Sequence, residues 1–144
     1  MPRARYSVAS WSLRLIEREK KFLENSSVHF IGVNDSETQV IGTCSISNIV
    51  RGVFQSCHMG YSVDKGFEGQ GRMQELAEYT IEYVFSEIKL HRVIANHMPQ
   101  NKRSEALLKR LGFEREGYAK RFLQIDGEWE DHVLNSLINK NYTG

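Results

Sequence analysis

The chain has no long hydrophobic run and almost no net charge, and each shortage excludes a class of protein. No apolar stretch approaches the roughly 20 residues that a membrane-spanning helix needs, so we expect no membrane partner. The formal net charge is only +1, so no overall field favours direct binding of nucleic acid. The charged Met1–Arg5 segment is not followed by the apolar run of a secretory signal, which predicts a cytoplasmic protein.

Cysteine is also scarce. Cys44 and Cys57 do not form a Cys-x-x-Cys pair, and both lie in segments with the pattern of strands. We expect reduced thiols, because a disulfide would need an oxidising compartment. Together with His91, His97 and His132 the two cysteines show no metal-ligand spacing, so we predict no metal site.

The composition is that of an ordinary folded domain. The chain has 144 residues, of which 40% are hydrophobic and 26% charged, and this balance argues against disorder. That length is enough for one hydrophobic core and too short for two comfortable ones. We therefore expect a single domain over residues 1–144.

Apolar periodicity predicts a mixed order of strands and helices. The expected strands are Val28–Val33, Gln39–Ile49, Val53–Val63, Arg92–Asn96, Tyr118–Ile125 and Trp129–Leu137. The expected helices are Ser10–Leu23, the segment after Gly71 up to Glu87, and Lys102–Leu111, which Gly112 ends. Asp126-Gly127 is a hairpin signal, and the first three strands most simply form an antiparallel meander. The predicted class is α+β, with a mixed, mostly antiparallel sheet flanked by helices.

A glycine-rich turn, Gly66–Gly71, joins the third expected strand to a helix. Such a turn leaves backbone N–H groups aimed outward at the positive end of the helix dipole. This arrangement favours an anion site for a phosphate or pyrophosphate, although the same turn also occurs for purely steric reasons.

A second motif lies thirty residues after Gly71. Asn101 is followed by Ser104 at +3 and by Gly112-Phe113 at +11 and +12. This spacing resembles the second acyl-CoA motif of the GCN5-related N-acetyltransferases, the GNAT family. The Gly66–Gly71 turn resembles their first motif, R/Q-x-x-G-x-G/A, which binds the pyrophosphate of coenzyme A.

Further segments are similar to the RimJ branch of that family, the ribosomal-protein alanine N-acetyltransferases. They are Asn48–Gly52, Gly60–Ser62, Gly112–Lys120 and Asp126–His132. The resemblance implies a GNAT fold and transfer of an acetyl group from acetyl-CoA to the α-amine of a protein N-terminus. The alternatives are a small acceptor (a polyamine, an amino acid or an aminoglycoside) and a weakly catalytic acyl-CoA-binding regulator.

The chain departs from the family pattern in three places. Gly66 stands where the first motif usually has Arg or Gln, and Leu108 stands where many members carry a tyrosine general acid. The family's usual first strand and first helix have no counterpart. The Val28–Val33 strand is therefore expected at an unpaired edge, which implies a homodimer or a truncated, less stable form unless residues 1–10 cover it.

The resemblance also implies site residues. The expected coenzyme A contacts are Tyr61, Ser62, Val63, Gly66, Gly69, Gln70, Gly71, Arg72, Asn101 and Ser104, with Lys102, Arg103 and Lys109 as nearby cations. Ser104 is the expected proton donor to the leaving thiolate, with Tyr118 in reserve. His58 is the candidate base, because its unperturbed pKa of roughly 6.5 suits proton transfer. A water chain ending at Glu68, Glu116 or Asp126 competes with His58, and purely structural roles for Ser104, Tyr118 and His58 stay open.

Overall fold

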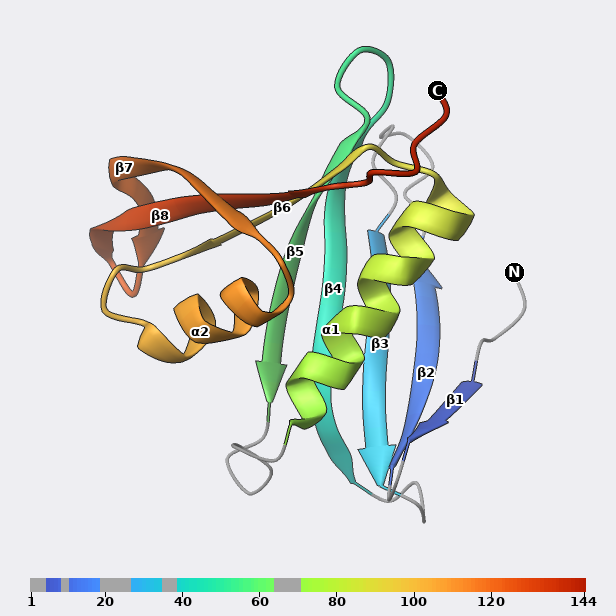
Figure 1. Ribbon diagram of the computed structural model, residues 1–144. Helices are drawn as coiled ribbons and strands as arrows, with labels where there is room; N and C mark the ends of the chain where they lie inside the picture. The colour runs from blue at the N-terminus through green and yellow to red at the C-terminus, as the bar shows by residue number, and fades with distance from the viewer. Residues whose placement is uncertain (1–4, 9–10, 19–26, 35–38, 64–70) are drawn as a thin grey trace.

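The fold is built on one mixed sheet with two helices packed against it (Figure 1). The computed structural model describes residues 5–8, 11–18, 27–34, 39–63 and 71–144. In these ranges the strands form an eight-stranded sheet in the order β1-β2-β3-β4-β5-β6-β8-β7. Every neighbouring pair is antiparallel except β5 and β6, which are parallel. The predicted fold class is confirmed.

The central strands form the predicted antiparallel meander. They are β3 (Ser27–Asn34), β4 (Val40–Val50) and β5 (Ser56–Val63). β5 begins at Ser56 rather than at Val53. The reason is that Gly52 and Gln55 take φ values of 71° and 48°, which turn the chain before the strand starts.

The helix expected over Ser10–Leu23 is wrong. Trp11–Arg18 forms strand β2, which pairs with β3, and Arg5–Val8 forms β1, which pairs with β2. Apolar residues occur at positions 11, 13 and 15, so this segment fits a period of two as well as a helical period. Pairing with β3 decides between the two patterns.

The same pairing changes the expectation for the sheet edge. β3 is hydrogen-bonded on both sides, so the predicted unpaired edge at Val28–Val33 is wrong. Residues 11–18 cover it, whereas residues 5–8 pair with β2 instead. An unpaired edge at this strand therefore no longer supports the predicted homodimer, which stays a prediction.

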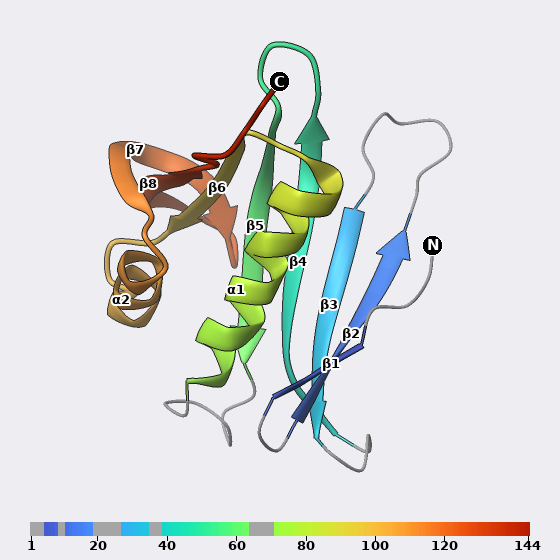
Figure 2. The ribbon, with the colours of Figure 1, turned by 45° about the vertical axis from the view of Figure 1, so that its right-hand side comes forward.

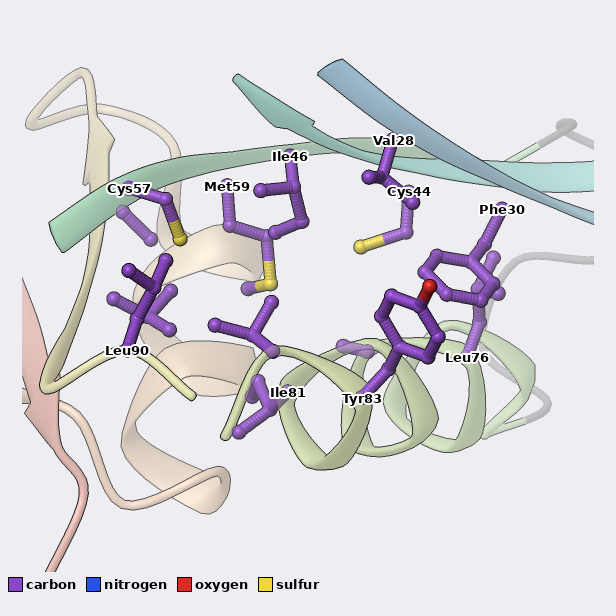
Figure 3. Close-up of a cluster of buried hydrophobic side chains, with 14 of the residues drawn as sticks. Val28, Phe30, Cys44, Ile46, Cys57, Met59, Leu76, Ile81, Tyr83 and Leu90 are labelled. Atoms are coloured by element: carbon purple, nitrogen blue, oxygen red, sulfur yellow. The ribbon is translucent and has the colours of Figure 1, made fainter. Parts of the chain in front are cut away.

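The first helix covers β3, β4 and β5, as both ribbon views show (Figures 1 and 2). α1 spans Arg72–Tyr83 and continues into the π-helical turn η2 (Val84–Ile88), which Lys89 ends with φ 60°. Its buried side packs on the core side chains of the sheet, among them Phe30, Cys44 and Met59 (Figure 3). This packing anchors the start of α1 beside the end of β5.

The second half of the chain contains β6 (Arg92–His97), α2 (Lys102–Arg110), β7 (Glu114–Ile125) and β8 (Glu128–Ile138). The predicted Asp-Gly hairpin is confirmed, because Asp126 and Gly127 take φ values of 49° and 82° between β7 and β8. Positive φ at both central residues is the requirement of a type I′ turn.

α2 ends where the sequence predicts. Gly112 has φ 93°, its N–H donates to the carbonyl of Lys109 at 3.1 Å, and the Phe113 N–H donates to the carbonyl of Leu108 at 2.9 Å. These two bonds form a Schellman motif, which favours glycine because only glycine takes positive φ without a Cβ penalty.

The two parallel strands separate part-way along their length. β5 and β6 pair at Ser56 with Arg92, Cys57 with Val93 and His58 with Ile94. Beyond His58, β5 pairs on with β4, whereas β6 pairs on with β8. In the described residues, the end of β5 therefore has a strand on one side only, and its N–H and C=O groups on the other side face the gap.

Candidate active site

A cavity of about 950 Å³ lies where β5 ends and where α1 and α2 begin. Its lining residues are Tyr61, Ser62, Val63, Gly71, Arg72, Met73, Gln74, Gln100, Asn101, Lys102, Arg103, Ser104, Ala106, Leu107 and Arg110. We call it the coenzyme pocket. The structure thus brings together every described residue of the predicted coenzyme A site. Gly66, Gly69 and Gln70 lie outside the described residues.

The charge of the coenzyme pocket is strongly one-sided. Four cations line it: Arg72, Lys102, Arg103 and Arg110. Its described lining contains no aspartate or glutamate, although the whole chain has a net charge of only +1. Cations gathered in a cleft raise the local concentration of an anionic ligand. The predicted cation Lys109 does not line this pocket, whereas Arg110, which the sequence analysis did not select, does.

The N-terminus of α1 opens into the coenzyme pocket without a side-chain cap. Its N-cap is Gly71, with φ 74°, and the first helical bond runs from the Glu75 N–H to the Gly71 carbonyl at 3.2 Å. The N–H groups of the first turn precede that bond, so they have no acceptor within the helix. Together with the helix dipole they suit a phosphate group, and among the described residues no atom outside the local backbone lies within 4 Å of where a Gly71 Cβ would be.

The N-terminus of α2 is capped instead. The Asn101 side-chain oxygen accepts the Ser104 N–H at 3.1 Å, which is an N-cap arrangement. The cap uses only the amide oxygen, so the Asn101 NH₂ group can still donate into the pocket. The structural role and the ligand role of Asn101 are therefore compatible.

The Tyr61 and Ser104 side chains both line the coenzyme pocket. Ser104 is only 9% exposed, and Tyr61 packs against the hydrophobic core. Burial raises the pKa of the Tyr61 phenol above its ordinary value of 10.0, and the nearby Ser104 side chain partly offsets that rise. The sequence analysis selected Tyr61 only for its backbone. The alternation of β5 could have indicated its inward side chain, because Cys57, Met59 and Tyr61 share one face.

Comparison with known proteins decides the family. The acetyltransferase (GNAT) domain matches residues 3–114. The ribosomal protein uS5-alanine N-acetyltransferase of Escherichia coli K12 is 43% identical over 136 residues, which cover 94% of this chain and 70% of that protein. The chain belongs to the GNAT family. Its relatives are N-acetyltransferases, so it is an N-acetyltransferase as predicted.

Two solved GNAT structures agree with the fold. The ribosomal-protein-S5-alanine acetyltransferase from Vibrio fischeri has a TM-score of 0.88 and 29% identity, covering 98% of this chain and 100% of that one. RimJ of Mycobacterium smegmatis, solved in complex with CoA-disulfide, has a TM-score of 0.75 and 30% identity, covering 82% of this chain and 56% of that one. The predicted resemblance to the RimJ branch is confirmed.

His58 occupies a special position in this GNAT sheet. It is the last β5 residue paired with β6, so it lies where the strands separate. It does not line the coenzyme pocket. Its neighbours Cys57 and Met59 face the α1 side, which places the His58 side chain on the opposite face of the sheet. Its Nδ1 atom is buried with no hydrogen-bond partner among the described residues, and burial lowers the pKa of the imidazole.

Tyr118 does not lie with Ser104. It lines a separate cavity of about 310 Å³ that α2 shares with β7 and β8. Tyr118 is 45% exposed and its hydroxyl donates to Asp131 Oδ2 at 2.6 Å. Leu108, at the usual place of the family's tyrosine acid, is buried in the core.

The carboxylates proposed as ends of a water chain lie apart from one another in the fold. Glu116 accepts a hydrogen bond from Arg92 at 2.8 Å. Hydrogen bonds from Ser136 and Arg92 lower the pKa of its carboxyl. Asp126 lies in the β7–β8 turn, and Glu68 lies outside the described residues. In the described part of the chain, His58 is the candidate nearest the strand separation.

No three His, Cys, Asp or Glu side chains of the described residues come together as a metal-binding group. The described helices are all too short or too polar to cross a membrane.

Proposed function

We propose that this GNAT enzyme takes the acetyl group of acetyl-CoA and transfers it to the α-amine of a protein N-terminus, with a ribosomal protein as the first candidate acceptor. The assignment of acetyl-CoA as the acetyl donor rests on the lining of the coenzyme pocket. Four cations and an uncapped helix N-terminus face one cavity, which is the donor set that a pyrophosphate needs. The 43% identity to a uS5-alanine N-acetyltransferase supports the choice of acceptor.

Different residues of the pocket have different proposed roles. Gly71, Arg72 and the cations at the start of α2 would hold the phosphates, and Asn101 and the free side of β5 would bond the amide arm. Acetyl-CoA supplies the activated thioester. Ser104 is placed to give a proton to the departing sulfur, and backbone N–H groups near Tyr61–Val63 would polarise the carbonyl.

The acceptor amine must be neutral when it attacks. We propose that His58 accepts the proton that the acceptor amine loses. Burial keeps its imidazole neutral at physiological pH, and the residue lies at the strand separation. An α-amine has a pKa of about 7.7–8.0, so the enzyme needs only modest help from this group.

A thiol-release assay with acetyl-CoA tests the proposal directly. The acceptors are peptides that begin with alanine, the same peptides with a blocked N-terminus, and small amines such as spermidine. We expect release only with the free α-amine. A preference for small amines would show that the acceptor is a small amine and not a protein N-terminus. Coenzyme A binding without thiol release with any acceptor would indicate a regulator.

A further inference from the structure

Arg110 lines the coenzyme pocket at the opposite end of α2 from Lys102. With a rise of about 1.5 Å per residue, the two positions lie roughly 12 Å apart along the helix axis. The Arg110 Nε–H donates to Gln74 Oε1 at 3.1 Å, which joins the end of α2 to the start of α1 (Figure 1). The pocket thus extends from the end of β5, past the start of α1, to the contact between Gln74 and Arg110.

Gln74 holds the Arg110 guanidinium in place without neutralising it. The Gln74 side-chain NH₂ donates to Glu78 Oε1 at 3.0 Å, which leaves the amide oxygen to accept from Arg110. Glu78 and Glu82 line a neighbouring groove with Arg110, yet in the described part of the chain Arg110 makes no ion pair with either carboxylate. A guanidinium has five N–H donors and the Gln74 contact uses one, so its two amino groups can bind a ligand.

The order of groups in coenzyme A matches the order of elements along the pocket. Two of its phosphates form the pyrophosphate, and the third is attached to the ribose beyond the pyrophosphate, on the side away from the thioester. With the thioester at the end of β5 and the pyrophosphate at the uncapped start of α1, the ribose 3′-phosphate lies toward Gln74 and Arg110. A phosphate monoester carries about 1.5 to 2 negative charges at neutral pH and fits the fork of a guanidinium in a bidentate contact.

We propose that Arg110, held by Gln74, binds the 3′-phosphate and makes the enzyme selective for coenzyme A over dephospho-coenzyme A, which lacks that group. This inference rests on the proposed use of acetyl-CoA, and it names the residue that recognises the end of the molecule away from the acetyl group. Because the contact is remote from the thioester, Arg110 acts on binding and not on the chemical step.

Lys109 offers a matched control for Arg110. Both are exposed cations in the last turn of α2, where a positive charge also interacts favourably with the helix dipole. Lys109 lines the separate cavity that α2 shares with β7 and β8, whereas Arg110 lines the coenzyme pocket. Replacing either residue by Gln removes one charge from the same turn, so a contact with the ligand is what distinguishes the two variants.

Calorimetric titration with coenzyme A and with dephospho-coenzyme A tests this assignment. We expect the wild type and Lys109→Gln to bind coenzyme A about tenfold more tightly than dephospho-coenzyme A, because a charge-assisted contact with phosphate is lost in the second ligand. Arg110→Gln should bind coenzyme A about tenfold more weakly and dephospho-coenzyme A as the wild type does. Gln74→Met, which removes the oxygen that holds the guanidinium, should reduce the ratio by a smaller factor.

Turnover gives a second measurement. Arg110→Gln should raise the KM for acetyl-CoA by about tenfold and leave kcat unchanged, which is the pattern of a contact made equally in the ground state and the transition state. Lys109→Gln should match the wild type in both constants.

The outcomes separate the role of Arg110 from the proposed function. Equal affinity of the wild type for the two ligands, or an Arg110→Gln variant that keeps the wild-type ratio, would overturn the role of Arg110 alone. The same holds if Lys109→Gln loses the ratio to the same extent, because the effect would then come from the charge of the helix end. A wild type that binds neither ligand would overturn the proposed function as well.

Discussion

The role of a single side chain in this site depends on its surroundings and on its position relative to the gap between β5 and β6. His58 and Glu116 were both candidate bases, and the pKa of each is lowered, from an ordinary value of 6.5 for the imidazole and of 4.5 for the carboxyl. Burial lowers the pKa of His58 and leaves its Nδ1 without a partner among the described residues. Glu116 is held as a carboxylate by Ser136 and Arg92, which makes it a weaker base. A neutral imidazole at the strand separation is the better proton acceptor.

Replacing His58 by Gln should lower kcat by about a hundredfold and remove an acid limb of the pH profile. A protonated imidazole cannot accept a proton, and its lowered pKa places that limb below about 6.5. The limb of the acceptor α-amine, near pH 7.7–8.0, should remain in both proteins. His91→Gln, at the residue just before β6, is the control. An unchanged pH profile in His58→Gln would assign the role of general base to water and a carboxylate.

The two helices of the site begin in opposite ways. α1 starts at a glycine that cannot cap it, and α2 starts at an asparagine that does. A cap satisfies N–H groups within the protein, whereas an uncapped first turn leaves them for a ligand. On the proposed function, this difference between the elements, rather than any one side chain, is why we assign the phosphates to the α1 end and the hydroxyl and amide contacts to the α2 end.

Gly71→Val should weaken coenzyme A binding steeply by blocking close approach to the α1 turn. Gly52→Val is a matched control, because Gly71 and Gly52 have φ values of 74° and 71° and, among the described residues beyond their chain neighbours, no atom lies within 4 Å of either Cβ position. Both variants should lose about 1 kcal/mol or more of folding stability from the positive φ. Only Gly71→Val should lose affinity in calorimetry. Equal affinities in the two variants would place the pyrophosphate elsewhere.

At the scale of the whole molecule, the core between the sheet and α1 holds both cysteines (Figure 3). Desolvation raises the pKa of Cys44 and of Cys57 from 9.0 to about 12. A group whose pKa is higher in the folded state stabilises that state fully below its unfolded pKa. The contribution is then lost as the pH rises through the folded pKa.

The free energy of unfolding should therefore fall as the pH rises above 9.0, by up to about 1.4 kcal/mol per pH unit for each thiol. Urea unfolding at a series of pH values measures this slope. Cys57→Ala should be less stable at neutral pH and should show a shallower alkaline slope. Equal stability on both sides of pH 9.0 would contradict the burial of these thiols.

Local interactions are what the sequence alone determined. The Gly112 helix stop and the Asp126-Gly127 turn each depend on residues a few positions apart, so spacing was enough to predict them. The predicted residues of the coenzyme pocket came from the resemblance to the two GNAT motifs, and the structure places the described ones around one cavity.

Only the tertiary structure decided the features that depend on distant partners. Residues 11–18 fit a helix or a strand by pattern, and pairing with β3 selects the strand. Tyr61 and Ser104 line one pocket because β5 and β6 separate, and Tyr118 lies with Asp131 because β7 pairs with β8. Side-chain period and local spacing carry no information about which distant segment a residue will meet, and that meeting set the chemistry of this site.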